Sequence, residues 1–366
     1  MLEKMKYKER ISVQQFLMEP KSTVLYIVAF VFSFLLALIT TPFSRKLAYQ
    51  VGAIDKPKKR GMHKKPMPLA GGTAIVLAFT VTVLILTPMV EDANWREVGG
   101  IIAGGLFISI VGFFDDIYDL SAKFKLMAQI IAGLIVIYSG ISINVITWPL
   151  LFGKTIPLPD HISLVLSLFW IVGITNAVNF IDGLDGLAAG VSFISALCFM
   201  FLSIMTGNPL AVLLTASLAG ACMGFLPHNF NPATIFMGDT GSTFLGFILA
   251  VSSIEGLFKG YTVITVVVAV LVLGLPIFDT AFAIIRRILK RQPVMQADRG
   301  HLHHRLVDKG YSQKKAVLTL YGISGGFGIT GILIASQDVQ FAMGLLCFMV
   351  ILIGFNYYHQ NNHTSS

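Results

Sequence analysis

The chain has 366 residues, of which 55% are hydrophobic and only 13% are charged, and its net charge at pH 7 is +8. With a mean hydropathy of +0.77, this composition excludes a water-soluble globular protein and predicts an all-α polytopic membrane protein. Basic residues in such a protein mark cytoplasmic loops, so no nucleic-acid partner is expected. Cys198, Cys222 and Cys347 lie inside apolar runs and support neither a disulfide framework nor a zinc site.

Transmembrane helices are predicted from apolar runs of about 20 residues, and the sequence has about 11 of them, or 10 to 11 because two are weak. A loop or small hairpin is expected over residues 142–160, where prolines and Gly153 interrupt β-branched residues. One integral-membrane domain over 23–358 should lie between a charged N-terminal tail, 1–22, and a C-terminal tail, 359–366. The predicted helices are 23–43, 69–88, 98–114, 126–141, 162–178, 187–206, 209–226, 240–257, 262–285, 317–336 and 340–358.

The distribution of Lys and Arg predicts the orientation. If residues 44–68 face the cytoplasm, the loops on that side hold 19 of the 27 basic residues. This places the N-terminus outside and the C-terminus inside, although the basic N-terminal tail argues weakly for the reverse. The expected cytoplasmic loops are 44–68, 115–125, 179–186, 227–239 and 286–316.

Four short clusters hold seven of the 19 acidic residues, and all fall on the predicted cytoplasmic side. An ionised carboxylate costs several kcal/mol near the bilayer interior, so each should lie at an interface or line a polar cavity. The sequence therefore predicts an active site open both to the cytosol and to the membrane. The clusters are Asp115-Asp116-Ile117-Tyr118-Asp119, Asn179 to Gly186, Phe236 to Ser242, and Asp298 to His304.

The chemistry of the first two clusters has functional and structural interpretations. Asp115 and Asp116 repel each other unless a cation or a raised pKa relieves them, so they favour Mg²⁺ binding, proton transfer or a phosphate beside the nearby lysines. A solvated helix end is the alternative. Glycines after Asp182 and Asp185 let the backbone approach a ligand closely, whereas a plain turn would use the same pairs.

The last two clusters are also ambiguous. Asp239 stands at the start of a predicted helix, where free N–H groups favour phosphate, or where it acts as an N-cap. The histidines after Arg299 are better suited to holding a diphosphate or sugar hydroxyls than to zinc. Four basic residues before them, Arg286 to Arg291, suit anionic lipid headgroups at least as well as a substrate.

In order, the motifs DDxxD, NxxNxIDGLDGLA, FMGDTGS and DRxHxHH, with His63 to Gly72 before them, resemble those of the polyprenyl-phosphate N-acetylhexosamine-1-phosphate transferases. The resemblance covers residues 63–306 and implies an MraY-like fold with a cytoplasmic-facing active site in the bacterial plasma membrane. The HLHH segment is closer to the WecA and TagO types, which use UDP-GlcNAc, than to the enzymes that use UDP-MurNAc-pentapeptide.

The resemblance implies transfer of GlcNAc-1-phosphate from UDP-GlcNAc to undecaprenyl phosphate, with release of UMP, as the first membrane step of teichoic acid or another surface polysaccharide. It also implies a Mg²⁺ requirement, with Mn²⁺ able to substitute, contact with membrane lipids, and a homodimer.

The family's roles fall on the following positions. Asp239 is the expected magnesium ligand, with Asn179 beside it, and Asp115 or Asp116 the expected base. Asp182 is a further essential carboxylate. The expected substrate-binding residues are Phe236 on uracil, Asn229 and Asp185 near the uridine, Lys64 or Lys65 near a phosphate, and Arg299, His301, His303 and His304 around the sugar and its diphosphate.

Other readings remain open at this point. A covalent aspartyl-phosphate route competes with direct attack of the lipid phosphate. Two other classes also keep carboxylates in the membrane: intramembrane prenyltransferases of the UbiA type and proton-coupled transporters. The second cluster lacks the DxxxD form that the former need, and no internal repeat supports the latter.

Overall fold

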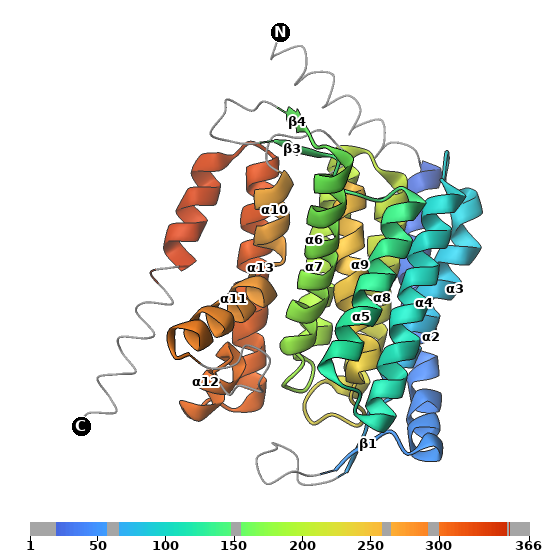
Figure 1. The fold of residues 1–366 in the computed structure, drawn as a ribbon, viewed down its shortest axis with the longest axis vertical. Helices are drawn as coiled ribbons and strands as arrows, with labels where there is room; N and C mark the ends of the chain where they lie inside the picture. The colour runs from blue at the N-terminus through green and yellow to red at the C-terminus, as the bar shows by residue number, and fades with distance from the viewer. Residues whose placement is uncertain are drawn as a thin grey trace.

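The computed structural model describes residues 20–56, 66–147, 155–257, 265–291, 300–349 and 351. The predicted tails, Lys64, Lys65, Asp298 and Arg299 lie outside them, except for residues 20–22. Within them the chain is a bundle of long apolar helices (Figure 1), which confirms the all-α polytopic fold. Nine helices of the described part are long and apolar enough to cross a membrane, or ten if one bent pair counts as a span.

Except for the span 262–285, each predicted span overlaps one α-helix of the described residues, and several helices are longer than predicted. Asp115 and Asp116 consequently lie in the last turn of a helix rather than in a loop. The helices are α2 (Pro20–Val51), α3 (Gly72–Leu86), α4 (Trp95–Tyr118), α5 (Ala122–Ser139), α6 (Asp160–Phe180), α7 (Leu187–Thr206), α8 (Pro209–Asn229), α9 (Gly238–Leu257), α10 (Thr265–Val272), α11 (Gly274–Leu289), α12 (Leu302–Asp308) and α13 (Gln313–Ala335), with a 3₁₀ turn at Thr87–Met89 and a shorter apolar helix at Val339–Met349.

Two small antiparallel hairpins complete the described structure. Strand β3 (Val145–Thr147) pairs with β4 (Thr155–Pro157), as expected for residues 142–160. Strand β1 (Ile54–Asp55) pairs with β2 (Met67–Pro68) at the opposite end of the bundle, at the bottom of Figure 1. This second hairpin places the segment that leads to α3 beside the start of α9.

The ninth predicted span is not one straight helix. In place of a continuous helix over 262–285, α10 and α11 meet at an angle of 86°. Gly274 and Pro276 stand at the start of α11, and proline removes a backbone donor and crowds the preceding turn. Gly274 and Pro276 are a helix-breaking signal in the sequence, but they lie within a continuous apolar run that is typical of a single span.

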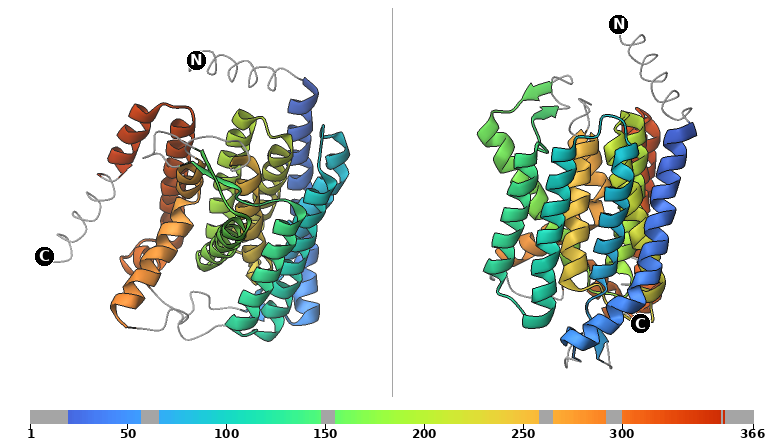
Figure 2. Two further views of the ribbon diagram at one scale, coloured as in Figure 1. Left: turned by 45° about the horizontal axis from the view of Figure 1, so that its top comes forward. Right: turned by 90° about the vertical axis from the view of Figure 1, so that its right-hand side faces the viewer.

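Helix α9 lies at the centre of the bundle (Figures 1 and 2), and every residue of its apolar window is buried. Small residues permit this close packing. A Cβ at Gly112 of α4 would lie only 2.7 Å from the carbonyl oxygen of Asp239, and one at Gly246 would lie 2.7 Å from Cα of Thr175 on α6. The central position of α9 brings its first turn, with Asp239, against the ends of α4 and α6.

Candidate active site

The described parts of all four clusters lie at one end of the bundle, at the bottom of Figure 1. Asp115 and Asp116 end α4, Asn179 stands one residue before the end of α6, Asp239 is in the first turn of α9, and the histidine segment begins α12. Segments separated by more than 180 residues in sequence are thus brought together, as the sequence predicts.

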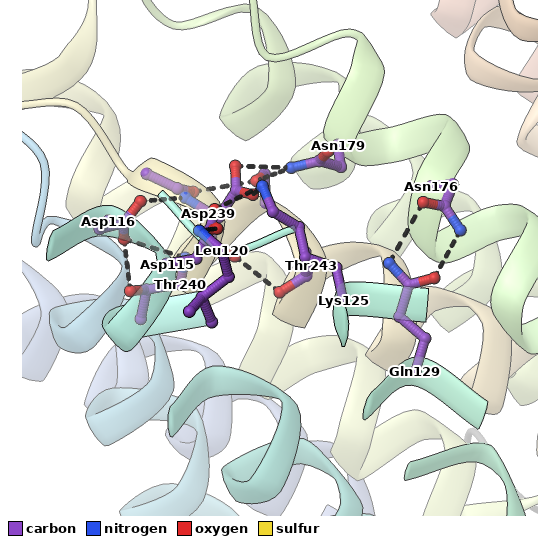
Figure 3. A network of polar contacts seen from close by, with 12 residues as sticks. Asp115, Asp116, Leu120, Lys125, Gln129, Asn176, Asn179, Asp239, Thr240 and Thr243 are labelled. Atoms are coloured by element: carbon purple, nitrogen blue, oxygen red, sulfur yellow. Dashed lines mark hydrogen bonds and ion pairs between the residues drawn. The ribbon is translucent and has the colours of Figure 1, made fainter. Parts of the chain in front are cut away.

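A lysine lies between two of the aspartates (Figure 3). Lys125 Nζ is 2.6 Å from Asp115 Oδ2 and 2.8 Å from Asp239 Oδ2. The other oxygen of Asp239 accepts a hydrogen bond from Asn179 Nδ2 at 3.0 Å. The ends of α4 and α6 and the first turns of α5 and α9 therefore build a half-buried site in which a cation already neutralises carboxylate charge.

Asp116 has a different environment from its neighbour. Its Oδ1 accepts from the backbone N–H of Asp239 at 2.7 Å, and its Oδ2 accepts from the N–H and the hydroxyl of Thr240 at 3.1 and 2.6 Å. The N–H groups of Asp239 and Thr240, expected to be free for phosphate, are thus capped by Asp116 from another helix. Asp116 consequently fixes the first turn of α9 and with it Asp239.

A second polar pair lies one turn deeper in the bundle. Gln129 and Asn176 exchange two amide hydrogen bonds, at 3.2 and 2.6 Å, between α5 and α6. Gln129 follows Lys125 by one turn, and Asn176 precedes Asn179 by one turn (Figure 3). The pair therefore ties together the two helices whose Lys125 and Asn179 side chains contact the carboxylate of Asp239.

Asp185 and Asn229 organise the loop between α8 and α9. Asp185 Oδ2 accepts from Asn231 Nδ2 and from the N–H of Ala233, and Asn229 Oδ1 accepts from the N–H of Gly186. Both residues are buried. Their expected place near uridine stays a prediction, and these bonds give each a structural role as well.

Phe236, expected to stack on uracil, is half-buried and held through its backbone. Its N–H donates to the carbonyl of Pro68, and its own carbonyl accepts from the N–H of Gly71. The segment that contains Lys64 and Lys65 ends beside this phenylalanine, although the two lysines lie outside the described residues.

The histidine segment packs against the loop that follows α6. The His301 ring lies 6.2 Å from the Phe180 ring and stacks on His303 at 5.7 Å between centroids. A Cβ at Gly183 would overlap Nε2 of His303, so glycine is required for this contact. Burial lowers the pKa of His303 to about 3, so its imidazole is neutral at physiological pH, and its Nε2 has no hydrogen-bond partner among the described residues. His304 is half-buried in the first turn of α12.

Asp182, in the loop after α6, lies within the electrostatic influence of three other carboxylates of the site. Burial, followed by the charges of Asp239, Asp116 and Asp185, raises the pKa of its carboxyl to about 8. A perturbed carboxyl within a cluster of carboxylates is typical of a functional site. This agrees with its predicted importance and does not test its role.

The donor set suits a hard divalent cation, although the described residues contain no group of three or more His, Cys, Asp or Glu side chains placed to hold a metal. Mg²⁺ is usually bound by one or two carboxylates together with substrate phosphates, so a complete protein cage is not required. Asp239 supplies a carboxylate, and the amide of Asn179 is adjacent to it.

Two residues of this site have no assigned role in the sequence-based prediction. Lys125 stands out only as a charge near the first cluster. Asp279, on α11, contacts His301 and Leu302 but lies alone in an apolar run. The signal that could have found it is the rule that an ionisable residue inside an apolar segment is a candidate functional residue.

Comparisons with known proteins agree with this geometry. Residues 98–257 match the model of glycosyl transferase family 4. The chain is 38% identical to a probable undecaprenyl-phosphate N-acetylglucosaminyl 1-phosphate transferase of Bacillus subtilis over 89% of this chain and 90% of that protein. It is 34% identical to a decaprenyl-phosphate N-acetylglucosaminephosphotransferase of Mycolicibacterium smegmatis over 87% and 85%. A phospho-N-acetylmuramoyl-pentapeptide-transferase of Staphylococcus aureus is 30% identical over 84% and 97%.

Proposed function

We propose that this chain, which belongs to glycosyl transferase family 4, transfers GlcNAc-1-phosphate from UDP-GlcNAc to undecaprenyl phosphate and releases UMP. The observation that carries the proposal is its identity to the Bacillus subtilis relative along nearly the whole of both chains. The similarity to the pentapeptide transferase is lower, which agrees with the HLHH segment. The prenyltransferase and transporter readings have no support from these relatives.

The reaction forms one phosphorus–oxygen bond and breaks another. An oxygen of the lipid phosphate attacks the phosphorus next to the sugar, the phosphoanhydride bond to UMP breaks, and UMP leaves with the electron pair. Several negative charges meet in this step, so positioning and neutralisation matter more than a strong nucleophile. Mg²⁺, or Mn²⁺ in its place, would supply charge neutralisation, held by Asp239 with Asn179 beside it.

The chain's own residues contribute charge and orientation. Lys125, between Asp115 and Asp239, is placed to contact a phosphate that enters this site. Asp115 is the better candidate for the base toward the lipid phosphate, because its Oδ2 faces Lys125 in the site, whereas both oxygens of Asp116 cap the start of α9. The site would face the cytoplasm, because the loops at its end of the bundle are those rich in Lys and Arg.

The test is UMP release by the purified protein in detergent with Mg²⁺. UDP-GlcNAc with undecaprenyl phosphate should give UMP, and UDP-MurNAc-pentapeptide should give little. Efficient use of the pentapeptide donor would refute the donor assignment. Exchange of labelled UMP into UDP-GlcNAc, in protein shown to be free of lipid phosphate, would refute direct attack and support the covalent route, which needs no acceptor in its first half.

A further inference from the structure

The buried side of α11 holds the histidine segment through two side chains. Asp279 Oδ2 lies 2.9 Å from His301 Nδ1, and Asp279 Oδ1 accepts from the N–H of Leu302 at 2.7 Å. Two turns along the same helix, Arg286 Nη1 donates to the carbonyl of Gly300 at 2.9 Å. Consecutive residues at the start of α12 are thus fixed from a helix that precedes them by 14 to 23 positions.

The hydrogen-bonding capacity of a carboxylate determines the tautomer of His301. An ionised carboxylate only accepts, so a bond from His301 Nδ1 requires the proton on that nitrogen. Nε2 is then the nitrogen left for a ligand. The Phe180 and His303 rings flank the imidazole, which restricts its rotation.

We propose that Asp279 is a positioning residue for the nucleotide-sugar site, which fixes the ring orientation and the tautomer of His301. This inference rests on the proposed function, because it gives His301 the donor substrate as its ligand. Phe180, against which His301 lies, follows Asn179 directly in sequence, and Asn179 donates to Asp239. The imidazole is therefore held against the end of α6, the helix whose Asn179 reaches the carboxylate cluster where the diphosphate would react.

A purely structural role would not require a carboxylate at this position. Asp279 is buried on α11 together with Ala283 and Arg287, and burial of a carboxylate is costly unless its oxygens are satisfied. Asparagine could accept from the N–H of Leu302 with one oxygen and would then present its NH₂ group to His301. Only a side chain that accepts on both sides serves the backbone and Nδ1–H together.

The variants Asp279→Ala, Asp279→Asn and Asp279→Glu separate these roles. Alanine removes both acceptors, asparagine removes one, and glutamate keeps both. The KM for UDP-GlcNAc should rise in the order Glu, Asn, Ala, by about tenfold for asparagine, equivalent to about 1.4 kcal/mol. The KM for undecaprenyl phosphate and the melting temperature of Asp279→Asn should stay at the wild-type values.

The matched control is Asp308→Asn, which changes an exposed carboxylate at the other end of α12 and should alter none of these quantities. If Asp279→Ala fails to fold, the KM values of Asp279→Asn and Asp279→Glu for UDP-GlcNAc still test the inference. A wild-type KM for UDP-GlcNAc in Asp279→Asn would overturn the inference. An equal rise in the KM for both substrates, together with a lower melting temperature, would also overturn it.

A second readout does not depend on turnover. Nitrogen-15 spectra of histidine-labelled protein, with the His301 signal assigned by its loss in His301→Gln, should show Nδ1–H in the wild type and Nε2–H in Asp279→Asn. The same tautomer in both proteins would refute the positioning role. If the wild type released no UMP from UDP-GlcNAc, the proposed function would fail, whereas this spectroscopic result would still report on Asp279.

Discussion

Asp115 and Asp116 are neighbours in sequence and differ in what they contact. Consecutive side chains on a helix point in different directions, so one faces Lys125 while the other faces the first turn of α9. One carboxylate is therefore available to the reacting groups. The other holds the helix that carries Asp239.

This division predicts different consequences for two substitutions. Asp115→Asn keeps an oxygen for the N–H of Leu120 and loses the charge beside Lys125, so turnover should fall by about a hundredfold at an unchanged melting temperature.

Asp116→Ala removes the cap of α9, so the free energy of unfolding should fall by about 1 kcal/mol, and activity should fall with it. Thermal unfolding and UMP release, measured on the same preparations, test both. A lower melting temperature for Asp115→Asn alone would contradict this assignment.

The sequence predicted the members of the aspartate clusters and could not predict their pairings. Motif spacing identifies Asp116 and Asp239 as important, yet the hydrogen bond between them joins residues 123 positions apart. Asp279 belongs to no local cluster, and its partner His301 is known only from the folded chain. Local patterns therefore locate the site. Tertiary packing decides which carboxylate faces the reacting groups, which one caps a helix and which one positions another side chain.

The helices were the most predictable elements, because a membrane span needs a long apolar run and little else. The break between α10 and α11 was not predicted, since Gly274 and Pro276 lie within such a run. Several helices also extend beyond their predicted bounds, because polar residues at a membrane surface can continue a helix. That extension places Asp115 and Asp116 on a rigid element.

The close contact of α4 and α9 gives a prediction at Gly112. A Cβ there would lie 2.7 Å from the carbonyl oxygen of Asp239 and 2.8 Å from Cα of Thr240, both backbone atoms. Gly112→Ala should therefore shift the start of α9 and reduce UMP release by about tenfold or more, because small displacements of positioning groups are costly to catalysis.

The matched control lies on the same helix. A Cβ at Gly99 meets nothing within 4 Å, so Gly99→Ala gains the same helix propensity without the overlap. Its UMP release should equal that of the wild type. Equal activity of the two alanine variants would show that the spacing of α4 and α9 does not set the position of Asp239.

The whole molecule separates its two ends by chemistry. The end drawn at the bottom of Figure 1 carries the described parts of the aspartate clusters and the histidine segment, and the other end carries the β3–β4 hairpin. A nucleotide-sugar comes from the cytosol and a lipid phosphate from the membrane, so a site at one end of the bundle, at the membrane surface, is accessible to both substrates. The Lys and Arg distribution predicts that the aspartate end faces the cytoplasm.

Labelling of single cysteines tests this orientation. Cys198 and Cys222 are buried, so Cys347→Ser provides the background. Ser121→Cys adds a thiol at the exposed start of α5 beside the aspartates, and His161→Cys adds one in the exposed first turn of α6 at the opposite end. If the Lys and Arg distribution orients the chain, a membrane-impermeant maleimide should label His161→Cys in intact cells and Ser121→Cys only after permeabilisation. The reverse pattern would place the aspartates outside, where the cell supplies no nucleotide-sugar, and would refute both the orientation and the cytosolic donor.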